Sequence, residues 1–340
     1  IIFNLAKVLE LLLHGGGDPA TGIRLFDVHE EELTDFDAFF TAYLDALKLL
    51  LKRAMHIERL RTAMWSRVNP SPLLSGTMAD CIASGRDVSE AGTKYNQSGI
   101  MCAGIGTLAD SLFAVKRLVF EEKRCMLPEL AAVLRSDWAG HEELRLYAKM
   151  RLPKWGNNLE GPDGLARRVT DFAAELINRE PNGKNGTFQM GLWSIDNNRL
   201  FGKKTGALPD GSRAGEELSK NTGASAGLDR RGVTALINSV AKLDHTGFAD
   251  GSVLDITLHP SAVSGPDGAE LIVDLVRTFF ARGGQSVQFN IFDAETLRRA
   301  QREPEKYANL QVRVCGWNAR FIDLSAEAQE AFIAAAGGEA

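Results

Sequence analysis

Residue types that commonly do chemistry are present in this sequence, but they are widely spaced. The four cysteines include no Cys-x-x-Cys pair and the six histidines include no pair four residues apart, so no metal site is predicted. There is no phosphate-binding loop that ends in Gly-Lys-Ser/Thr and no His-Glu-x-x-His motif. Two residues remain as candidates for lining a substrate pocket: Trp193, and His259, which precedes Pro260 at the end of a predicted strand.

Residues 104–109 (GIGTLA) match the glycine fingerprint with which dinucleotide-binding folds bring a pyrophosphate to a helix N-terminus. Residues 98–103 before it do not form a clean apolar strand pattern. The acids Glu121 and Glu122, at the spacing where a ribose ligand is expected, lie at the end of a predicted helix. We interpret Gly104 to Ala109 as tight packing before a helix, and keep an NAD-binding oxidoreductase as an alternative from another functional class.

The segment that is hardest to explain as ordinary structure lies near the C-terminus, at residues 313–321 (RVCGWNARF). Gly316 follows a predicted strand and precedes an aromatic residue. Glycine is common where φ is positive or another backbone approaches closely, so a plain turn at the strand end is one interpretation. The neighbours that would matter in a functional loop are Arg313, Cys315, Trp317, Asn318 and Phe321.

This segment resembles the radical-bearing loop of the glycyl radical enzymes, the pyruvate formate-lyase and glycerol dehydratase family. The family pattern is Arg-Val-small-Gly-aromatic with a phenylalanine a few residues later. Cys315 stands where serine or alanine is usual and Trp317 where tyrosine is usual, which leaves the subfamily open. Further segments resemble the same family in its order and cover nearly the whole chain: residues 95–122, 155–158, 201–215, 232–245 and 283–317.

The resemblance implies radical chemistry at Gly316, with no bound cofactor. A radical-SAM activating enzyme, which carries a 4Fe-4S cluster, would remove a hydrogen atom from the α-carbon of Gly316. Because glycine has no Cβ, this carbon can become planar and share the unpaired electron with both flanking peptide groups. The radical would then take a hydrogen atom from a cysteine on a second loop, and the thiyl radical would attack the substrate in a site closed to oxygen and water.

The resemblance also places the catalytic cysteine outside this sequence. In the family, the cysteine loop lies upstream of the helix that corresponds to residues 3–14, so the cysteine should precede Ile1. We therefore expect the chain to be inactive alone, either as a fragment or as half of a split enzyme. Cys102 lies in a segment that matches the family downstream of the cysteine loop, and we interpret it as a small buried residue.

Hydrophobic spacing predicts the elements that must position these residues. A short helix is expected from Phe3 to Leu12, before three glycines, and a long helix over 34–64 with Thr34 as its N-cap. Strand and helix patterns then follow one another, which predicts parallel pairing and an α/β fold. The remaining predicted helices lie at 107–120 with Thr107 as N-cap, at 165–177, at 269–280, from Asp293 to before Pro304, and from Ser325; the strands lie at 253–258, 286–291 and 310–314.

The strongest break in the chain is the glycine-rich, charged segment 202–215, and we place the main boundary there. The resemblance then implies that residues 1–208 are the C-terminal part of a pyruvate formate-lyase-type barrel domain and residues 209–340 a glycine radical domain. The expected fold is the C-terminal half of a ten-stranded α/β barrel with surrounding helices. Half a barrel has an open edge, so the chain alone should be poorly stable or associated.

Composition excludes several classes of protein. The chain has 340 residues, 44% of them hydrophobic, and a net charge of −5, which gives no reason to expect nucleic-acid or anionic-membrane binding. Charged residues interrupt the apolar runs well before the roughly 18 residues that a membrane-spanning helix needs. Four scattered cysteines suit a reducing cytoplasm.

We therefore predict an anaerobic, cytoplasmic radical lyase. Radical elimination from a small polyol or similar substrate, as in a dehydratase, is favoured because KLDHTG and LHPSAV look closer to the dehydratase-type members than to pyruvate formate-lyase. Formate C-acetyltransferase activity is the alternative within the family. A third possibility is a non-catalytic domain that accepts a radical for a partner chain. The expected partners are the activating enzyme, a small-molecule substrate and, in the intact enzyme, a second copy in a homodimer.

Overall fold

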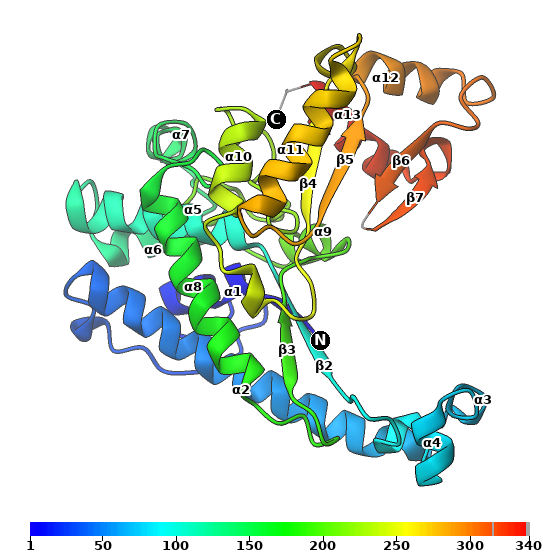
Figure 1. Cartoon of the computed structure of the whole chain (residues 1–340). Helices are drawn as coiled ribbons and strands as arrows, with labels where there is room; N and C mark the ends of the chain where they lie inside the picture. Colours follow the sequence, from blue (N-terminus) through cyan, green and yellow to red (C-terminus); the bar gives the residue numbers. More distant parts are fainter. Residues whose placement is uncertain (315, 338–340) are drawn as a thin grey trace.

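Parallel strands organise the first part of the chain. The computed structural model describes residues 1–314 and 316–337. β1 (Ile2–Asn4), β2 (Ser98–Ala103) and β3 (Phe188–Gly191) form a parallel sheet with β2 in the centre (Figure 1). After β3, Leu192 forms a parallel bridge with Ser252, and β4 (Leu254–Leu258) then pairs in parallel with β5 (Val287–Ile291).

The central strand of this sheet was not predicted from the sequence, and one residue was assigned to the wrong element. Residues 98–103 form its central strand, although their pattern is not clean, and Phe3 lies in β1 rather than in a helix. A central strand is packed on both faces, so it has no reason to alternate apolar and polar residues. Ile100, Cys102 and Ala103 are fully buried accordingly.

Helices cover this sheet and make the main core. α1 (Leu5–Leu13), α2 (Phe36–Val68), α5 (Ile105–Val115) and α8 (Glu160–Asn178) pack against one another around buried side chains such as Leu9, Leu47 and Leu112. α5 continues into a π-helical turn at Lys116–Glu121. The other helices before β4 are shorter: α3 (Pro72–Ser75), α4 (Ala79–Ser84), α6 (Leu127–Arg135), α7 (Glu142–Met150), α9 (Asn197–Gly202) and α10 (Val233–Val240).

The long helix α2 was predicted, but its N-cap was not. Asp35, rather than Thr34, caps the helix, since its Oδ1 accepts a hydrogen bond from the backbone N–H of Ala38 at 2.9 Å. Likewise Gly104, with φ of +83°, stands at the N-terminus of α5 in place of Thr107. In both cases the hydrophobic spacing predicted the helix correctly, but not the residue at which the helix starts.

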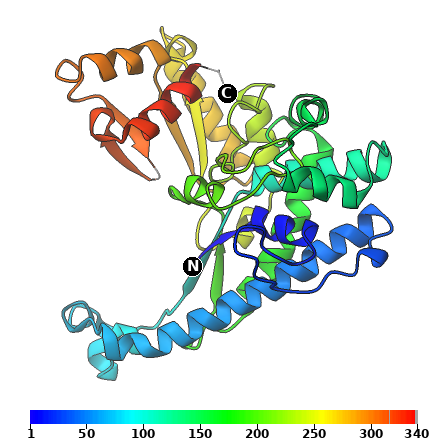
Figure 2. The same cartoon turned by 180° about the vertical axis from the view of Figure 1, so that it is seen from behind.

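The C-terminal elements gather at the end of the molecule opposite α3 and α4 (Figures 1 and 2). α11 (Gly268–Ala281) connects β4 to β5 as predicted, and α12 (Ala294–Arg302) is capped by Asp293. β6 (Gln311–Val314) and β7 (Trp317–Arg320) form an antiparallel hairpin before α13 (Ala326–Gly337). β7 was not predicted. This part has its own small core: Phe292, Leu297, Ala300, Val312, Phe321 and Ile333.

Of the expected half of a ten-stranded α/β barrel, the structure confirms the α/β class but not the ten-stranded barrel. The described residues form a mixed α/β structure whose parallel strands stay in open sheets of three and two strands. A closed barrel is absent from residues 1–314 and 316–337. In this same part of the chain, no helix combines the length and the hydrophobicity that crossing a membrane requires.

Candidate active site

Gly316 lies at the tip of the β6–β7 hairpin. The strands pair from Gln311 with Arg320 to Val314 with Trp317, so Gly316 lies in the connection between them. Gly316 has φ of +99°, a region that side chains disfavour, and it is exposed. Apart from its chain neighbours, no described heavy atom lies within 4 Å of where a Cβ would be. Cys315, a predicted loop neighbour, lies outside the described residues.

Arg313 connects the hairpin to β5. Its backbone N–H donates to Asn290 Oδ1 at 3.0 Å, and its Nε donates to Gln288 Oε1 at 2.8 Å. Its Nη1 also donates to Asn318 Oδ1 at 3.2 Å across the hairpin, while Asn318 Nδ2 donates to Gln311 Oε1 at 3.3 Å. Two of the predicted loop neighbours, Arg313 and Asn318, are therefore in direct contact.

The other two described loop neighbours have different environments. Phe321 is fully buried in the small C-terminal core, and its backbone N–H donates to the carbonyl of Leu310 at 2.8 Å. It fixes the base of the hairpin. Trp317 is 52% exposed, an unusual environment for so large an apolar side chain. The tip thus carries an exposed glycine next to an exposed indole.

Trp193 follows β3, where the sheet continues toward β4. Its indole Nε1 donates to the carbonyl of Asp250 at 3.0 Å, and the ring is partly buried. Two residues later, Ile195 has φ of +50°. This region is rare for a β-branched residue, and such strain concentrates at functional sites. Trp193 therefore lies beside a strained turn at a strand end.

His259 follows β4 but has an ordinary structural role here. Its side chain accepts from the backbone N–H of Ser261 and caps a short 3-10 turn at Pro260–Val263. Its Nδ1 also lies 2.7 Å from Ser261 Oγ. The residue is exposed, and its hydrogen bonds within the described chain are local. The structure does not bring His259 to Trp193 through any of these bonds.

Asp255 on β4 was not singled out from the sequence. Its Oδ2 accepts from Asn221 Nδ2 at 2.6 Å and lies 3.2 Å from Lys220 Nζ. Its Oδ1 is buried without a hydrogen-bond partner among the described residues, and buried polar atoms in this condition are uncommon. Asp255 pairs in register with Gln288, so this polar cluster lies beside the contact that holds the hairpin. The alternation of apolar and polar residues along 253–258 could have pointed to Asp255, because it puts this residue on the other face of the strand from the buried Leu254 and Ile256.

The structure leaves no space for a dinucleotide at Gly104 to Ala109. The strand, positive-φ glycine and helix that the fingerprint needs are present as β2, Gly104 and α5. However, the first turn of α5 is already occupied: the N–H of Thr107 donates to Ser219 Oγ at 3.1 Å, and the N–H of Ser219 donates to Thr107 Oγ1 at 2.8 Å. A Cβ on Gly106 would lie 2.7 Å from the carbonyl oxygen of Gly223. A pyrophosphate has no room there.

Residues 223–227 (GASAG) have the Gly-x-Ser-x-Gly spacing of a hydrolase nucleophile, which needs a strand before the serine and a helix after it. Ser225 instead lies in the loop between α9 and α10, and its Oγ lies 3.1 Å from Thr107 Oγ1. The spacing does not correspond to a nucleophile elbow in this fold.

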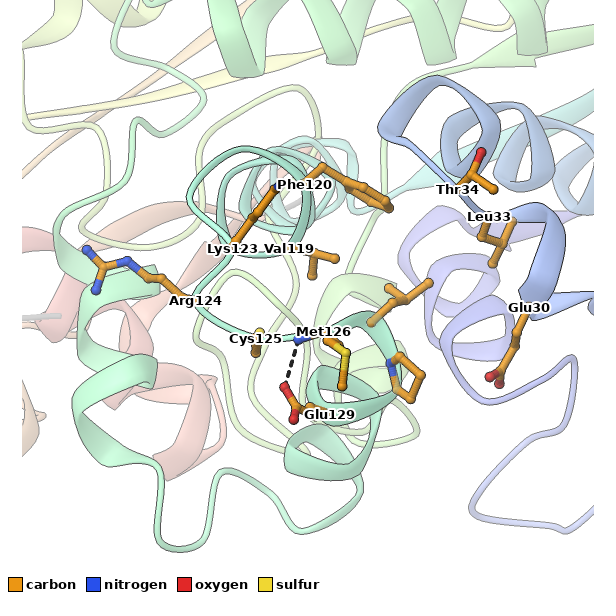
Figure 3. Close-up of a pocket in the computed structure, with 12 residues that line it drawn as sticks. Glu30, Leu33, Thr34, Val119, Phe120, Lys123, Arg124, Cys125, Met126 and Glu129 are labelled. Carbon is orange, nitrogen blue, oxygen red and sulfur yellow. Dashed lines mark hydrogen bonds between the residues drawn. The ribbon is translucent and has the colours of Figure 1, made fainter.

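Two cysteines in the main body are poorly suited to act as thiolate nucleophiles. Cys102 is fully buried on β2, and burial raises the pKa of its thiol to about 12. This agrees with its interpretation as a small core residue. Cys125 lines a cavity of about 500 Å³ between the segments 30–34 and 119–129 (Figure 3), and partial burial raises its pKa to about 11. None of Gly316, Trp193 and His259 lines that cavity.

Comparison with known proteins covers nearly the whole chain. Residues 1–202 match the family model described as pyruvate formate lyase-like, and residues 218–322 match the one described as glycine radical. A (2S)-3-sulfopropanediol dehydratase of Klebsiella oxytoca is 30% identical over 97% of this chain and 41% of its own length. A trans-4-hydroxy-L-proline dehydratase of Clostridioides difficile is 31% identical over 97% of this chain and 42% of its own.

Solved structures give the same result. The glycerol-bound form of the B12-independent glycerol dehydratase from Clostridium butyricum superposes with a TM-score of 0.92 and 36% sequence identity, covering 98% of this chain and 42% of that one. The chain therefore spans less than half the length of the relatives that it matches.

Proposed function

This chain belongs to the glycyl radical enzyme family, with a pyruvate formate lyase-like part and a glycine radical part, and on that premise we propose that it stores a radical on Gly316 for radical elimination from a small substrate. The observation that carries the proposal is the hairpin itself. Gly316 lies inside the glycine radical match, at positive φ, at the exposed tip of two paired strands.

The hairpin geometry suits hydrogen-atom removal. An activating enzyme of the radical-SAM class, with its 4Fe-4S cluster, would break one Cα–H bond of Gly316 homolytically and leave with the hydrogen atom. The remaining carbon can flatten because no Cβ and no nearby heavy atom of the described chain opposes it. Exposure of the tip makes Gly316 accessible to that partner.

We propose that the thiol partner and the shielding of Gly316 come from the part of the relatives' length that this chain does not span. Cys102 is fully buried in the main core, and Cys125 lines a cavity that Gly316 does not line. Cys81 is buried on α4, on the far side of the molecule from the hairpin (Figure 1). The chain alone is then inactive. The intact protein would enclose the hairpin and exclude oxygen and water.

We propose a dehydratase-like reaction, with Trp193 and Asp255 as candidates for the substrate pocket and His259 as a weaker one. The relatives named above are dehydratases of a diol sulfonate, of hydroxyproline and of glycerol, which supports C–O bond elimination. The carboxylate of Asp255 has a free acceptor oxygen that could take a substrate hydroxyl. Formate C-acetyltransferase activity is the weaker candidate, since none of these relatives carries that name.

The domain division at residue 208, a homodimeric intact enzyme and a cytoplasmic location also remain proposals. The family matches end at residue 202 and resume at residue 218, on either side of the proposed boundary. The glycine-rich segment between them packs against α7, for example through Arg145 Nη1, which donates to the carbonyl of Gly211 at 3.1 Å.

Electron paramagnetic resonance tests the proposal. After anaerobic treatment with a radical-SAM activating enzyme, the intact protein should show a doublet from the α-proton that remains on Gly316, and exposure to oxygen should cut the chain at that residue. Both results should disappear in Gly316→Ala. An activated protein with neither signal would exclude radical storage at this residue.

A further inference from the structure

Side chains, rather than a β-ladder, attach the glycine hairpin to β5. Among the described residues β6 is hydrogen-bonded as a strand only to β7, and β5 only to β4. Even so, β5 and β6 lie side by side (Figure 1). The main-chain bonds that usually join neighbouring strands are therefore replaced by something else at this junction.

Two amide side chains of β5 make the replacement. Asn290, only 6% exposed, accepts the backbone N–H of Arg313 with its Oδ1, as a main-chain carbonyl would do in a ladder. Gln288 accepts Arg313 Nε with its Oε1. Gln288 and Asn290 share one face of β5 because side chains alternate along a strand. We call these two residues and Arg313 the hairpin dock.

We propose that Gln288 and Asn290 are positioning residues, which fix where Gly316 stands when a hydrogen atom moves to or from its α-carbon. This inference rests on the proposed function. Transfer between two atoms needs close approach, and a small displacement of the tip lowers the rate strongly. No described heavy atom beyond the chain neighbours lies within 4 Å of the Cβ direction of Gly316, so packing on that side does not fix the tip. The dock holds Arg313, three residues before Gly316, and together with the buried Val312 and Phe321 it sets the place of the tip.

The chemistry of the dock makes it reversible. A carboxylate at position 288 would form an ion pair with the Arg313 guanidinium, which is stronger than the bond from this guanidinium to the neutral amide of Gln288. Positions 288 and 290 both carry a neutral amide instead. Release of the hairpin from β5 breaks two side-chain hydrogen bonds and leaves both strand pairs, β4–β5 and β6–β7, intact. Because Val312 and Phe321 are buried with residues of α12 and α13, the hairpin would move away from β5 together with this small core.

Hydrogen exchange in the full chain tests the dock without any radical. Asn290→Leu keeps the volume and removes the acceptor, so exchange of the Arg313 amide should rise about tenfold. Asn290→Asp keeps an acceptor oxygen and should restore most of the protection. Thr257→Val is the control, because Thr257 is the exposed register partner of Asn290 on β4 and should leave the Arg313 amide unchanged. Unchanged exchange in Asn290→Leu, or no rescue by Asn290→Asp, would overturn the dock.

The radical signal tests the positioning role in the activated intact protein. We expect Asn290→Leu to shorten the lifetime of the Gly316 doublet under a fixed oxygen exposure about tenfold, and Gln288→Glu to slow radical installation by holding Arg313 more tightly. Equal lifetimes and installation rates in all variants, together with the exchange result above, would refute positioning. If no variant and not even the unchanged protein gives a doublet, the proposed function fails, while the exchange experiment still decides whether the dock exists.

Discussion

Gly316 combines two properties that usually exclude each other, since it is placed by a rigid hairpin yet has open space around its α-carbon. Its φ of +99° is disfavoured for any residue with a Cβ, but the space beside it is empty of described atoms. A substitution at this residue therefore measures the cost of the positive φ alone, without a steric clash.

We expect Gly316→Ala to abolish the radical while leaving the fold intact. Strain at positive φ should lower the free energy of unfolding by only about 1 kcal/mol, because no described atom is displaced. Chemical denaturation of the variant and the parent protein measures this. Gly283→Ala is a matched control, as Gly283 has φ of +94° and open space as well, but lies outside the hairpin. A loss of several kcal/mol in Gly316→Ala alone would mean that the hairpin is packed against something else.

Asp110 is a second residue with an unusual environment. It is buried in α5, where its Oδ1 accepts the backbone N–H of Trp155 at 2.6 Å and its Oδ2 has no partner among the described residues. Burial raises the pKa of this carboxyl to about 7, and the charge of Lys154 only partly opposes the rise. The folded protein thus holds a proton that the unfolded chain releases near pH 4.

This linkage predicts a pH dependence with a definite sign. Between about pH 4 and pH 7 the folded state binds one proton more than the unfolded state at Asp110, so this group's contribution to stability falls as the pH rises. The slope is at most about 1.4 kcal/mol per pH unit. Urea unfolding at several pH values should show that Asp110→Asn loses this slope, while the exposed Asp45→Asn on α2 keeps it. If the free energy of unfolding of Asp110→Asn and of the parent protein changed with pH in the same way, the raised pKa of Asp110 would be contradicted.

At the scale of elements, the helix α2 shows how a start position is decided. Its apolar stripe runs from Phe36 through Phe39, Phe40, Tyr43 and Leu47, all of which are buried. Thr34 and Asp35 are both acceptable N-cap types, and the sequence favoured the wrong one. The structure selects Asp35 because its carboxylate reaches the N–H of Ala38.

Alanine substitutions at the two positions test this assignment. Asp35→Ala should lower the free energy of unfolding by about 1 kcal/mol, because it removes the cap and an acid from the positive end of the helix. Thr34→Ala, at an exposed neighbouring residue, should change it by less than about 0.5 kcal/mol. Thermal or chemical denaturation of both variants measures these changes. A larger effect at Thr34 would show that Thr34 is the N-cap, as the sequence predicted.

The junction of β5 and β6 is the second feature at this scale. A strand over 286–291 puts Gln288 and Asn290 on one face because side chains alternate, but the sequence does not tell what that face contacts. The structure puts the hairpin on it, through side chains only. The polar face of this strand thus binds Arg313, the residue three positions before Gly316.

At the scale of the whole molecule, the C-terminal elements form a body with its own core. Phe292, Leu297, Val312 and Phe321 pack together apart from the main core. Ion pairs cross to the rest of the protein, with Glu327 of α13 lying 2.9 Å from Lys203 Nζ and 3.9 Å from Arg199 Nη1. Such surface pairs contribute little to stability, and the body also contacts β4 through α13 and β5 through β6.

The open sheet predicts how the chain behaves alone. β1 is an edge strand of the parallel sheet, and an unpaired edge invites pairing with another chain. We expect association that grows with concentration, measured by analytical ultracentrifugation. A monomer that stays monodisperse at high concentration and melts cooperatively would contradict this expectation.

The sequence by itself determined the family, the long helix α2, the β4–α11–β5 unit and the position of Gly316, because these follow from motifs and from periodicity within one segment. Only the tertiary structure decided that 98–103 is a central strand, that the first turn of α5 is filled by Ser219 and Gly223, and that Arg313 docks on β5. Each of these depends on contacts between residues far apart in the chain. Local propensity cannot encode such contacts, because they exist only after the segments have packed together.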